Sequence, residues 1–175
     1  ATNLVIDQLG KLHDEKLDAV NNRMRELGLT NTKLLNKLYS WKTKKKTAEA
    51  LRFGIGVSTP LDMIILLEKV EKGEIISESI SRQIFSILKN QQDITMAQRY
   101  LPFGEDTTLT VANKTGSLDA VKNDVGIVSG AHVHYVYAIF CDQSKELGEQ
   151  IDGKTTLAAA KASELLFKYF KGKGR

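Results

Sequence analysis

Apolar residues recur at helical spacing over much of the first ninety residues. The pattern predicts a helix over residues 2–9 that ends at Gly10. It predicts a second helix after Asp14 that ends at Gly28, because glycine readily adopts the left-handed conformation that closes a helix. The apolar face of this second helix consists of Leu17, Val20, Met24 and Leu27. Residues 29–57 show no clean period, so a long loop is expected there, and loops of this length are often functional.

Two further helices have clear start signals. Thr59 is expected to cap the third helix, with Pro60 in its first turn and Asp62 near its positive end. Its buried face would contain Met63, Leu66, Leu67 and Val70, and Gly73 would end it. A fourth helix is expected to begin near Ser77 or Ser79 and to bury Ile80, Ile84, Ile87 and Leu88.

After Pro102 the period changes from that of a helix to that of strands. Strands are expected over residues 108–117, 122–130 and 133–141, and the short polar turns between them make neighbouring strands antiparallel. A last helix is expected over residues 154–171, packed on the sheet through Ala158, Ala162, Leu165, Leu166 and Tyr169.

These elements predict an α+β fold, in which a helical lobe precedes an antiparallel three-stranded meander and a C-terminal helix. We place the helical lobe at residues 1–102, with an Ω-like loop at about 36–57. Residues 103–175 form the sheet with its helix. The chain opens inside an apolar-periodic pattern, so further residues are expected upstream of Ala1.

The composition is that of an ordinary globular protein, with 42% hydrophobic and 26% charged residues and a net charge of +4. Lysines cluster at Lys42 and 44–46 and again near the C-terminus, and we interpret both clusters as solvated. Only Tyr39 and Trp41 flank the first cluster, so a nucleic-acid partner is not expected. No run is long enough to span a bilayer. Cys141 is the only cysteine and is interpreted as a small buried hydrophobe.

The chemically most informative segment is Lys114-Thr115-Gly116-Ser117, which lies in the first predicted strand. It places a cation and hydroxyl groups on an exposed strand edge. Taken alone, this segment is more typical of an exposed strand with a solvated lysine. His132 and His134 lie two residues apart on one strand face, but no suitable third ligand is near. We therefore expect no metal and no cofactor.

Several segments, in this order along the chain, are similar to those of class A β-lactamase-like serine hydrolases, a group related to penicillin-binding proteins. They are Ala1-Thr2-Asn3-Leu4, residues 26–34, residues 58–63, Lys114-Thr115-Gly116-Ser117, and Asn123-Asp124-Val125. The resemblance covers essentially all 175 residues and corresponds to the carboxy-terminal two-thirds of such a protein. It implies a helical lobe and a five-stranded sheet, of which this chain supplies three strands.

The resemblance also implies roles for four residues. Lys114 would attract the substrate carboxylate and assist proton transfer at a serine, which makes it the catalytic residue of this chain. The Thr115 hydroxyl would donate to the same carboxylate. Gly116 would let the substrate approach the strand edge. The backbone N–H of Ser117 would be one of two oxyanion donors.

The nucleophile of this family is a serine in a Ser-x-x-Lys motif. We expect that motif, together with Ser-Asp-Asn, upstream of Ala1, and we assign no serine of this chain as nucleophile. The position expected to hold the carboxylate that activates the deacylating water is Leu38. Glu49 is interpreted as a solvated helix residue, with a surrogate catalytic role as the alternative. Asn3 would brace the helical wall of the site.

The sequence thus predicts part of a serine hydrolase in which a β-lactam or a related amide or ester acylates a serine. The chain alone is expected to be inactive. The alternative is a non-catalytic or degenerate penicillin-binding or esterase-like module, which would complete its sheet with a second chain or a swapped copy. If the resemblance holds, the protein is bacterial and periplasmic or secreted.

Overall fold

A computed structural model describes residues 2–12, 18–38, 46–146, 150–171 and 173 of the chain. The chain divides into two compact units, Ala1–Leu66 and Leu67–Arg175. This division rests on spatial contacts, whereas the lobes predicted at 1–102 and 103–175 group elements by type, so that boundary stays a prediction. None of the described helices is long and apolar enough to cross a bilayer.

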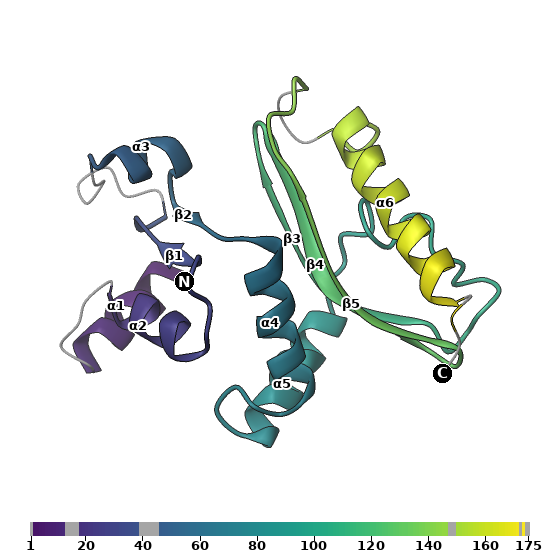
Figure 1. Cartoon of the computed structure of the whole chain (residues 1–175), viewed down its shortest axis with the longest axis horizontal. Coiled ribbons are helices and arrows are strands. Elements are labelled where there is room, and N and C mark those ends of the chain that lie inside the picture. Colours follow the sequence, from purple (N-terminus) through teal and green to yellow (C-terminus); the bar gives the residue numbers. More distant parts are fainter. Residues whose placement is uncertain (1, 13–17, 39–45, 147–149, 172, 174–175) are drawn as a thin grey trace. The chain divides into compact units, whose positions relative to one another are not determined.

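The first unit contains short helices and a two-stranded sheet (Figure 1). The first helix runs two residues beyond the predicted stop, because Gly10 is buried within it rather than ending it. Gly28 has a φ of 85° and follows the second helix as predicted. The elements are α1 (Thr2–Leu12), α2 (Asp18–Glu26), β1 (Lys33–Leu34), α3 (Ala48–Phe53), β2 (Gly56–Val57) and the start of α4 (Pro60–Glu71).

The expectation of one long loop over residues 29–57 is wrong for the described part of that segment. β1 and β2 pair as antiparallel strands, and Thr47 caps α3 by accepting a hydrogen bond from the Ala50 N–H. A Cβ on Gly56 would lie 2.8 Å from the Lys33 carbonyl oxygen, so the close strand approach requires glycine there. Two-residue strands and a six-residue helix are too short to produce a detectable hydrophobic period. The predicted loop residues 39–45 lie outside the described residues.

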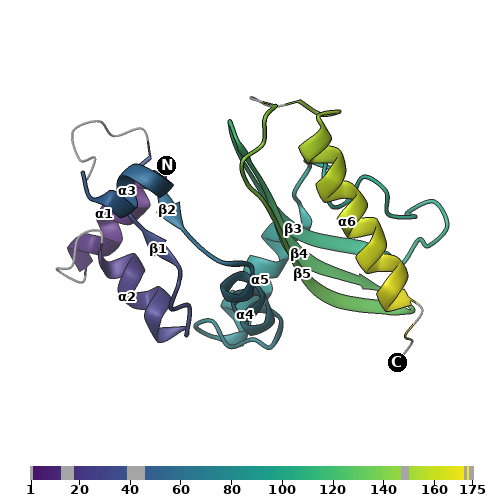
Figure 2. The ribbon, with the colours of Figure 1, turned by 45° about the horizontal axis from the view of Figure 1, so that its top comes forward.

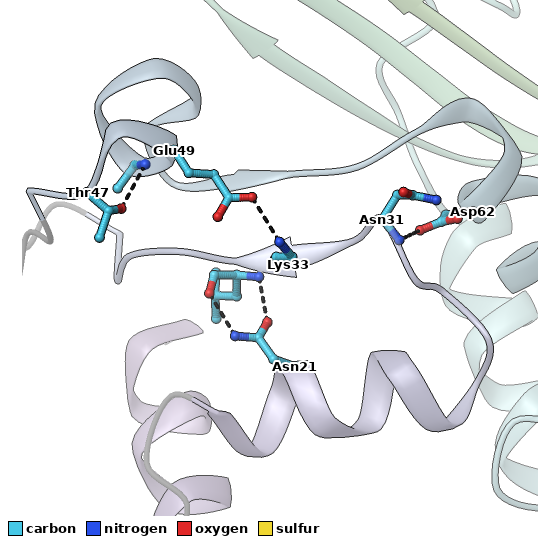
Figure 3. Close-up of polar contacts among 8 residues, drawn as sticks. Asn21, Asn31, Lys33, Thr47, Glu49 and Asp62 are labelled. Carbon is cyan, nitrogen blue, oxygen red and sulfur yellow. Dashed lines mark hydrogen bonds and ion pairs between the residues drawn. The ribbon is translucent and has the colours of Figure 1, made fainter.

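Side-chain hydrogen bonds connect this segment to the helices beside it (Figure 3). Asn21 accepts from the Leu34 N–H at 2.7 Å and donates to the Leu34 carbonyl at 3.0 Å. Asp62, predicted only as a partner of the helix dipole, is 1% exposed and accepts from the Asn31 N–H and the Thr32 hydroxyl, each at 2.8 Å. The carboxylate at the start of α4 therefore also fixes the loop entrance.

The predicted caps of the next two helices are confirmed, but one predicted face is not. Thr59 accepts from the Asp62 N–H at 3.2 Å, and Ser77 caps α5 (Glu78–Lys89). Ile87, predicted to be buried, is 71% exposed. The fully buried residue of α5 is Ser81, whose hydroxyl accepts from the Ile75 N–H at 3.3 Å. The fully buried position of this helix is therefore a hydrogen-bonded hydroxyl residue, which a pattern of apolar residues does not reveal.

The second unit is built on a three-stranded antiparallel sheet of order β3-β4-β5. The strands are β3 (Thr110–Leu118), β4 (Val121–Gly130) and β5 (Val133–Cys141), close to the predicted ranges. Helix α6 (Lys154–Lys171) has the predicted range and packs on one face of the sheet (Figure 2). The core between them includes Val111, Val128, Tyr135, Tyr137 and Phe167, and Tyr135 stacks on Phe170 at 4.7 Å.

The predicted packing face of α6 is confirmed at Leu166, which packs against the core, but is wrong at other positions. Leu165 and Tyr169 are 58% and 54% exposed, and Ala158 is exposed as well. The buried positions are Thr156, Ala159, Ala160, Ser163 and Phe167. Two of these are hydroxyl residues whose side chains donate to backbone carbonyls, Thr156 to Gln150 at 3.0 Å and Ser163 to Ala97 at 2.8 Å.

A buried carboxyl group connects the sheet to the segment before it. Asp124 on β4 is 0% exposed and accepts from Asn113 on β3, Tyr137 on β5 and the Ala97 backbone N–H, at 2.9–3.0 Å. Burial is the largest influence and raises the pKa of Asp124 to about 6, although the three donors act in the opposite direction. One side chain therefore links all three strands to residue 97.

The first prediction concerns Asn21. Replacing it with alanine removes both hydrogen bonds to Leu34, so we expect the free energy of unfolding of the first unit to fall by about 2 kcal/mol. Urea denaturation measures the loss, and the Leu34 amide should exchange faster with solvent. Gln8→Ala, at an exposed position of α1, is the control. Equal unfolding free energies in the two variants would contradict the prediction.

The second prediction concerns the pH dependence of stability. The folded pKa of Asp124 lies above its ordinary value of 3.8, so the folded state binds more protons than the unfolded state between 3.8 and about 6. Its contribution to the free energy of unfolding is therefore greatest at low pH and decreases as the pH rises towards 6, by about 3 kcal/mol in total. Asp124→Asn removes this dependence, whereas Asp119→Asn, on the exposed β3–β4 turn, should retain it. Parallel stability–pH curves for all three proteins would contradict the assignment.

Candidate active site

The Lys-Thr-Gly segment lies on a free strand edge. Within the described residues, β3 pairs with β4 and with no other strand. Lys114, Gly116 and Ser117 are exposed and Thr115 is half-buried. Successive strand residues point to opposite faces, so Lys114 and Thr115 can meet one anion only by reaching around the edge. The four predicted site residues are thus contiguous, with the Lys114 side chain on one face and those of Thr115 and Ser117 on the other.

Space above the edge is open at Gly116. A Cβ built there would meet no atom within 4 Å, so packing inside this chain does not require glycine. Gly126 on β4 is the contrast, because a Cβ there would lie 2.7–2.8 Å from Ala112, Asn113 and Tyr137. Gly126 is therefore explained by core packing, whereas Gly116 leaves room for a molecule against the strand.

An acidic residue that sequence reasoning missed lies beside the segment. Asp93 accepts from the Thr95 N–H at 3.0 Å and from the Thr95 hydroxyl at 2.6 Å. Partial burial acts to raise its pKa, but the hydrogen bonds from Thr95 and Thr115 and the charge of Lys114 together lower the pKa below its ordinary value. Thr115 and Lys114 therefore both act on the pKa of one carboxyl group, that of Asp93, while the Lys114 ammonium itself donates to the Thr115 carbonyl.

A cavity of about 290 Å³ adjoins the end of the segment. Its lining includes Asp93, Thr95 and Ser117, together with Lys122, Gln150 and Thr156. Lys122 lies opposite Ser117 on β4, is 4% exposed, and its ammonium donates to the Leu118 carbonyl at 3.1 Å. The available signal for Lys122 was its position on the inward face of β4, two residues from Asp124, where a lysine is unusual.

The prediction that His132 and His134 share one strand face is wrong, because His132 lies in the turn between β4 and β5. His134 Nδ1 lies 3.0 Å from the Ser129 hydroxyl, and Nε2 forms an ion pair with Glu71 at the end of α4. Among the residues that the structure describes, no group of three His, Cys, Asp or Glu side chains could hold a metal ion. Cys141 is half-buried rather than buried, and this burial raises the pKa of its thiol.

The position where a deacylating carboxylate was sought is held from both sides by Asn3. Asn3 donates to the Leu38 carbonyl at 2.7 Å and accepts from the Leu38 N–H at 2.9 Å. The bracing role predicted for Asn3 thus has a defined partner, a backbone segment that carries a leucine. Glu49 lies in α3 and pairs with Lys33 at 3.0 Å (Figure 3), in keeping with its interpretation as a solvated helix residue.

One serine does have the spacing of the nucleophile motif, so the expectation that none in this chain does is wrong. Ser86-Ile87-Leu88-Lys89 forms the last turn of α5. Ser86 and Lys89 are both exposed, and neither lines the cavity beside Ser117. The spacing alone therefore brings no hydroxyl to the Lys-Thr-Gly edge. The chain contains no Ser-Asp-Asn triplet.

Comparison with solved structures shows the same fold in three proteins. A β-lactamase from Sphaerobacter thermophilus is 31% identical, with a TM-score of 0.69 over 94% of this chain and 57% of that one. PBP-A is 23% identical, with a TM-score of 0.70 over 88% of this chain and 51% of that one. The TLA-1 extended-spectrum β-lactamase is 23% identical, with a TM-score of 0.69 over 95% of this chain and 59% of that one.

The chain thus spans between half and three-fifths of the length of these structures. No match is found among curated proteins. The model of the β-lactamase enzyme family matches residues 1–170, nearly the whole chain. On this match, and on the shared arrangement of the antiparallel sheet and its C-terminal helix, the chain belongs to the β-lactamase enzyme family.

Proposed function

We propose that this chain supplies the carboxylate-binding and oxyanion-binding strand of a serine acyl-transfer site, for a β-lactam or a related amide or ester. The observation that supports the proposal most directly is the free edge of β3, where Lys114 and Thr115 act on one carboxylate and the space above Gly116 is open. The chain's membership of a hydrolase family makes acyl transfer the reaction to test first.

Each residue of the edge has a defined part in this proposal. The Lys114 ammonium and the Thr115 hydroxyl bind the substrate carboxylate through charge-assisted hydrogen bonds. The Ser117 N–H donates to the oxyanion that develops when the carbonyl is attacked, a contribution typically worth about 10²–10³ in rate. Lys122, itself largely buried, adds a second positive charge behind Ser117 in the same cavity.

The attacking hydroxyl lies outside these 175 residues in this proposal. Ser86 is solvent-exposed at the end of a helix and has no place in the cavity that contains Ser117. Nucleophilic serines need an adjacent base and nearby oxyanion donors. The chain alone should therefore bind ligands at the β3 edge without being acylated.

Slow release of an acyl group is the second part of the proposal. Leu38 occupies a backbone position held by Asn3 but has no carboxylate to activate water. PBP-A has been solved as an acyl-enzyme complex with penicillin G in a variant that replaces a leucine with glutamate. A penicillin-binding function with slow turnover is therefore as compatible with this chain as rapid β-lactam hydrolysis.

The third prediction tests the β3 edge. In amide NMR spectra of the chain, benzylpenicillin should shift the Gly116 and Ser117 signals in a saturable way. Lys114→Ala should weaken this binding about tenfold, because a hydrogen bond to a charged group is lost. Lys89→Ala removes the same charge from an exposed position of α5 and should bind like the original chain.

Intact-mass measurements on the same samples should show no covalent adduct. A stable acyl adduct on the chain alone would place the nucleophile inside it and contradict this part of the proposal. Unchanged Gly116 and Ser117 signals at high ligand concentration would contradict carboxylate binding at the edge. Equal affinities for the Lys114 and Lys89 variants would remove Lys114 from the site.

A second candidate function is a non-catalytic module that completes its sheet with another chain. It is favoured by the two free edges of the described sheet, since β3 and β5 each pair only with β4. Unpaired N–H and C=O groups along an edge can pair with a strand of a second molecule. A second copy, exchanged or added edge to edge, is the simplest such partner.

The fourth prediction separates this candidate from a simple monomer. Edge pairing between copies would raise the mass measured by light scattering from 19.4 kDa towards twice that value as concentration increases. The amides of the pairing strand should become protected from hydrogen exchange over the same range. A constant monomer mass at the highest accessible concentration would rule out edge-completed assembly of this chain.

A further inference from the structure

The segment that carries Asp93 is fixed by hydrogen bonds on both sides. The Gln91 side chain donates to the Asp93 carbonyl at 2.9 Å and accepts from the Asp93 N–H. Downstream, the Ala97 N–H donates to Asp124 and the Ala97 carbonyl accepts from Ser163. The backbone at Asp93 therefore has a position defined by hydrogen bonds, and the segment after it is anchored to β4 and α6.

That position lies against the binding groups of the β3 edge. Asp93 and Ser117 line the same cavity of about 290 Å³. Hydrogen bonding from Thr115 and the charge of Lys114 both lower the pKa of Asp93, so both groups act on its carboxylate. Thr95 also donates to it, through both its N–H and its hydroxyl. The groups that would bind a substrate carboxylate thus already act on a carboxylate of the protein.

We propose that Asp93 is a specificity-determining residue of this site: a resident carboxylate that competes with the carboxylate of a substrate for Thr115 and Lys114. The proposal rests on the proposed function of the β3 edge and deepens it. An incoming anion must either displace Asp93 from Thr115 or accept a like charge beside it. A neutral ester or amide in the same place meets no such repulsion, so Asp93 shifts the preference of the site towards uncharged substrates.

The expected size of the effect of Asp93 on anion binding follows from the exposure of its side chain to solvent. Asp93 is exposed to solvent, so its repulsion acts through water and should weaken anion binding only about fivefold at low salt. Dissolved ions screen charges at this distance, so the effect should shrink as salt is added. A purely structural role for Asp93 would show no such salt dependence and would not distinguish charged from neutral ligands.

The fifth prediction compares benzylpenicillin with its methyl ester, two ligands that differ in one charge. Binding of each is followed through the Gly116 and Ser117 amide signals. Asp93→Asn should bind benzylpenicillin about fivefold more tightly than the original chain at low salt, and the ester almost unchanged. Glu105→Gln, an exposed position near the other end of β3, removes the same charge and should leave both affinities unchanged.

The outcomes separate this inference from the function on which it rests. If benzylpenicillin binds in a Lys114-dependent way but Asp93→Asn leaves the acid-to-ester ratio unchanged, the inference is wrong and the function stands. If Glu105→Gln raises the affinity for the acid as much as Asp93→Asn does, net charge explains the effect and the inference is also wrong. If neither ligand shifts the two amide signals in any variant, the proposed function fails, and the inference fails with it.

Discussion

The arrangement of the sheet depends on one buried carboxyl group. Asp124 accepts hydrogen bonds from a side chain on each neighbouring strand and from the backbone at residue 97. A buried acceptor that lost these donors would cost more than the bonds contribute, so each donor is held in place by the others. Asn113, one of those donors, directly precedes Lys114 on β3. The network inside the sheet therefore fixes the register of the strand whose outer edge carries the candidate site.

The same network sets the charge at that edge. By anchoring Ala97, Asp124 also positions the segment before it, where Asp93 and Thr95 lie beside Thr115. The edge then contains one carboxylate between two lysines, Lys114 in solvent and Lys122 largely buried. Two cations with one resident anion leave a positive excess, which suits an anionic or polarised ligand, and the resident anion makes that excess smaller by one charge.

Local signals were enough to predict much of the second unit. The candidate site came from the family resemblance of four adjacent residues on one strand, and it stays a prediction. The range of α6 and the three strands followed from hydrophobic period and turn residues. The packing face of α6 did not follow in full from these local signals, because Ser163 is buried by a hydrogen bond to Ala97, 66 residues away. Asp93 was missed for the same reason, since only folding brings it to Ser117, whereas Lys122 had a local signal in its position on β4. β1, α3 and β2 were missed because they are too short to show a period.

The alternation of side chains on β3 explains why such a site must lie at an edge. Lys114 and Thr115 leave the strand on opposite faces, so within a sheet paired on both sides a neighbouring strand would separate their groups. At a free edge both can turn towards one ligand, and backbone N–H groups of the same strand are unpaired and able to donate. Thr115 and Lys114 both lower the pKa of Asp93, so the two groups already act on one carboxylate of the protein. A strand that paired at this edge would remove the site, so binding at the β3 edge and completion of the sheet there are mutually exclusive. Assembly through β5 would leave the candidate site intact.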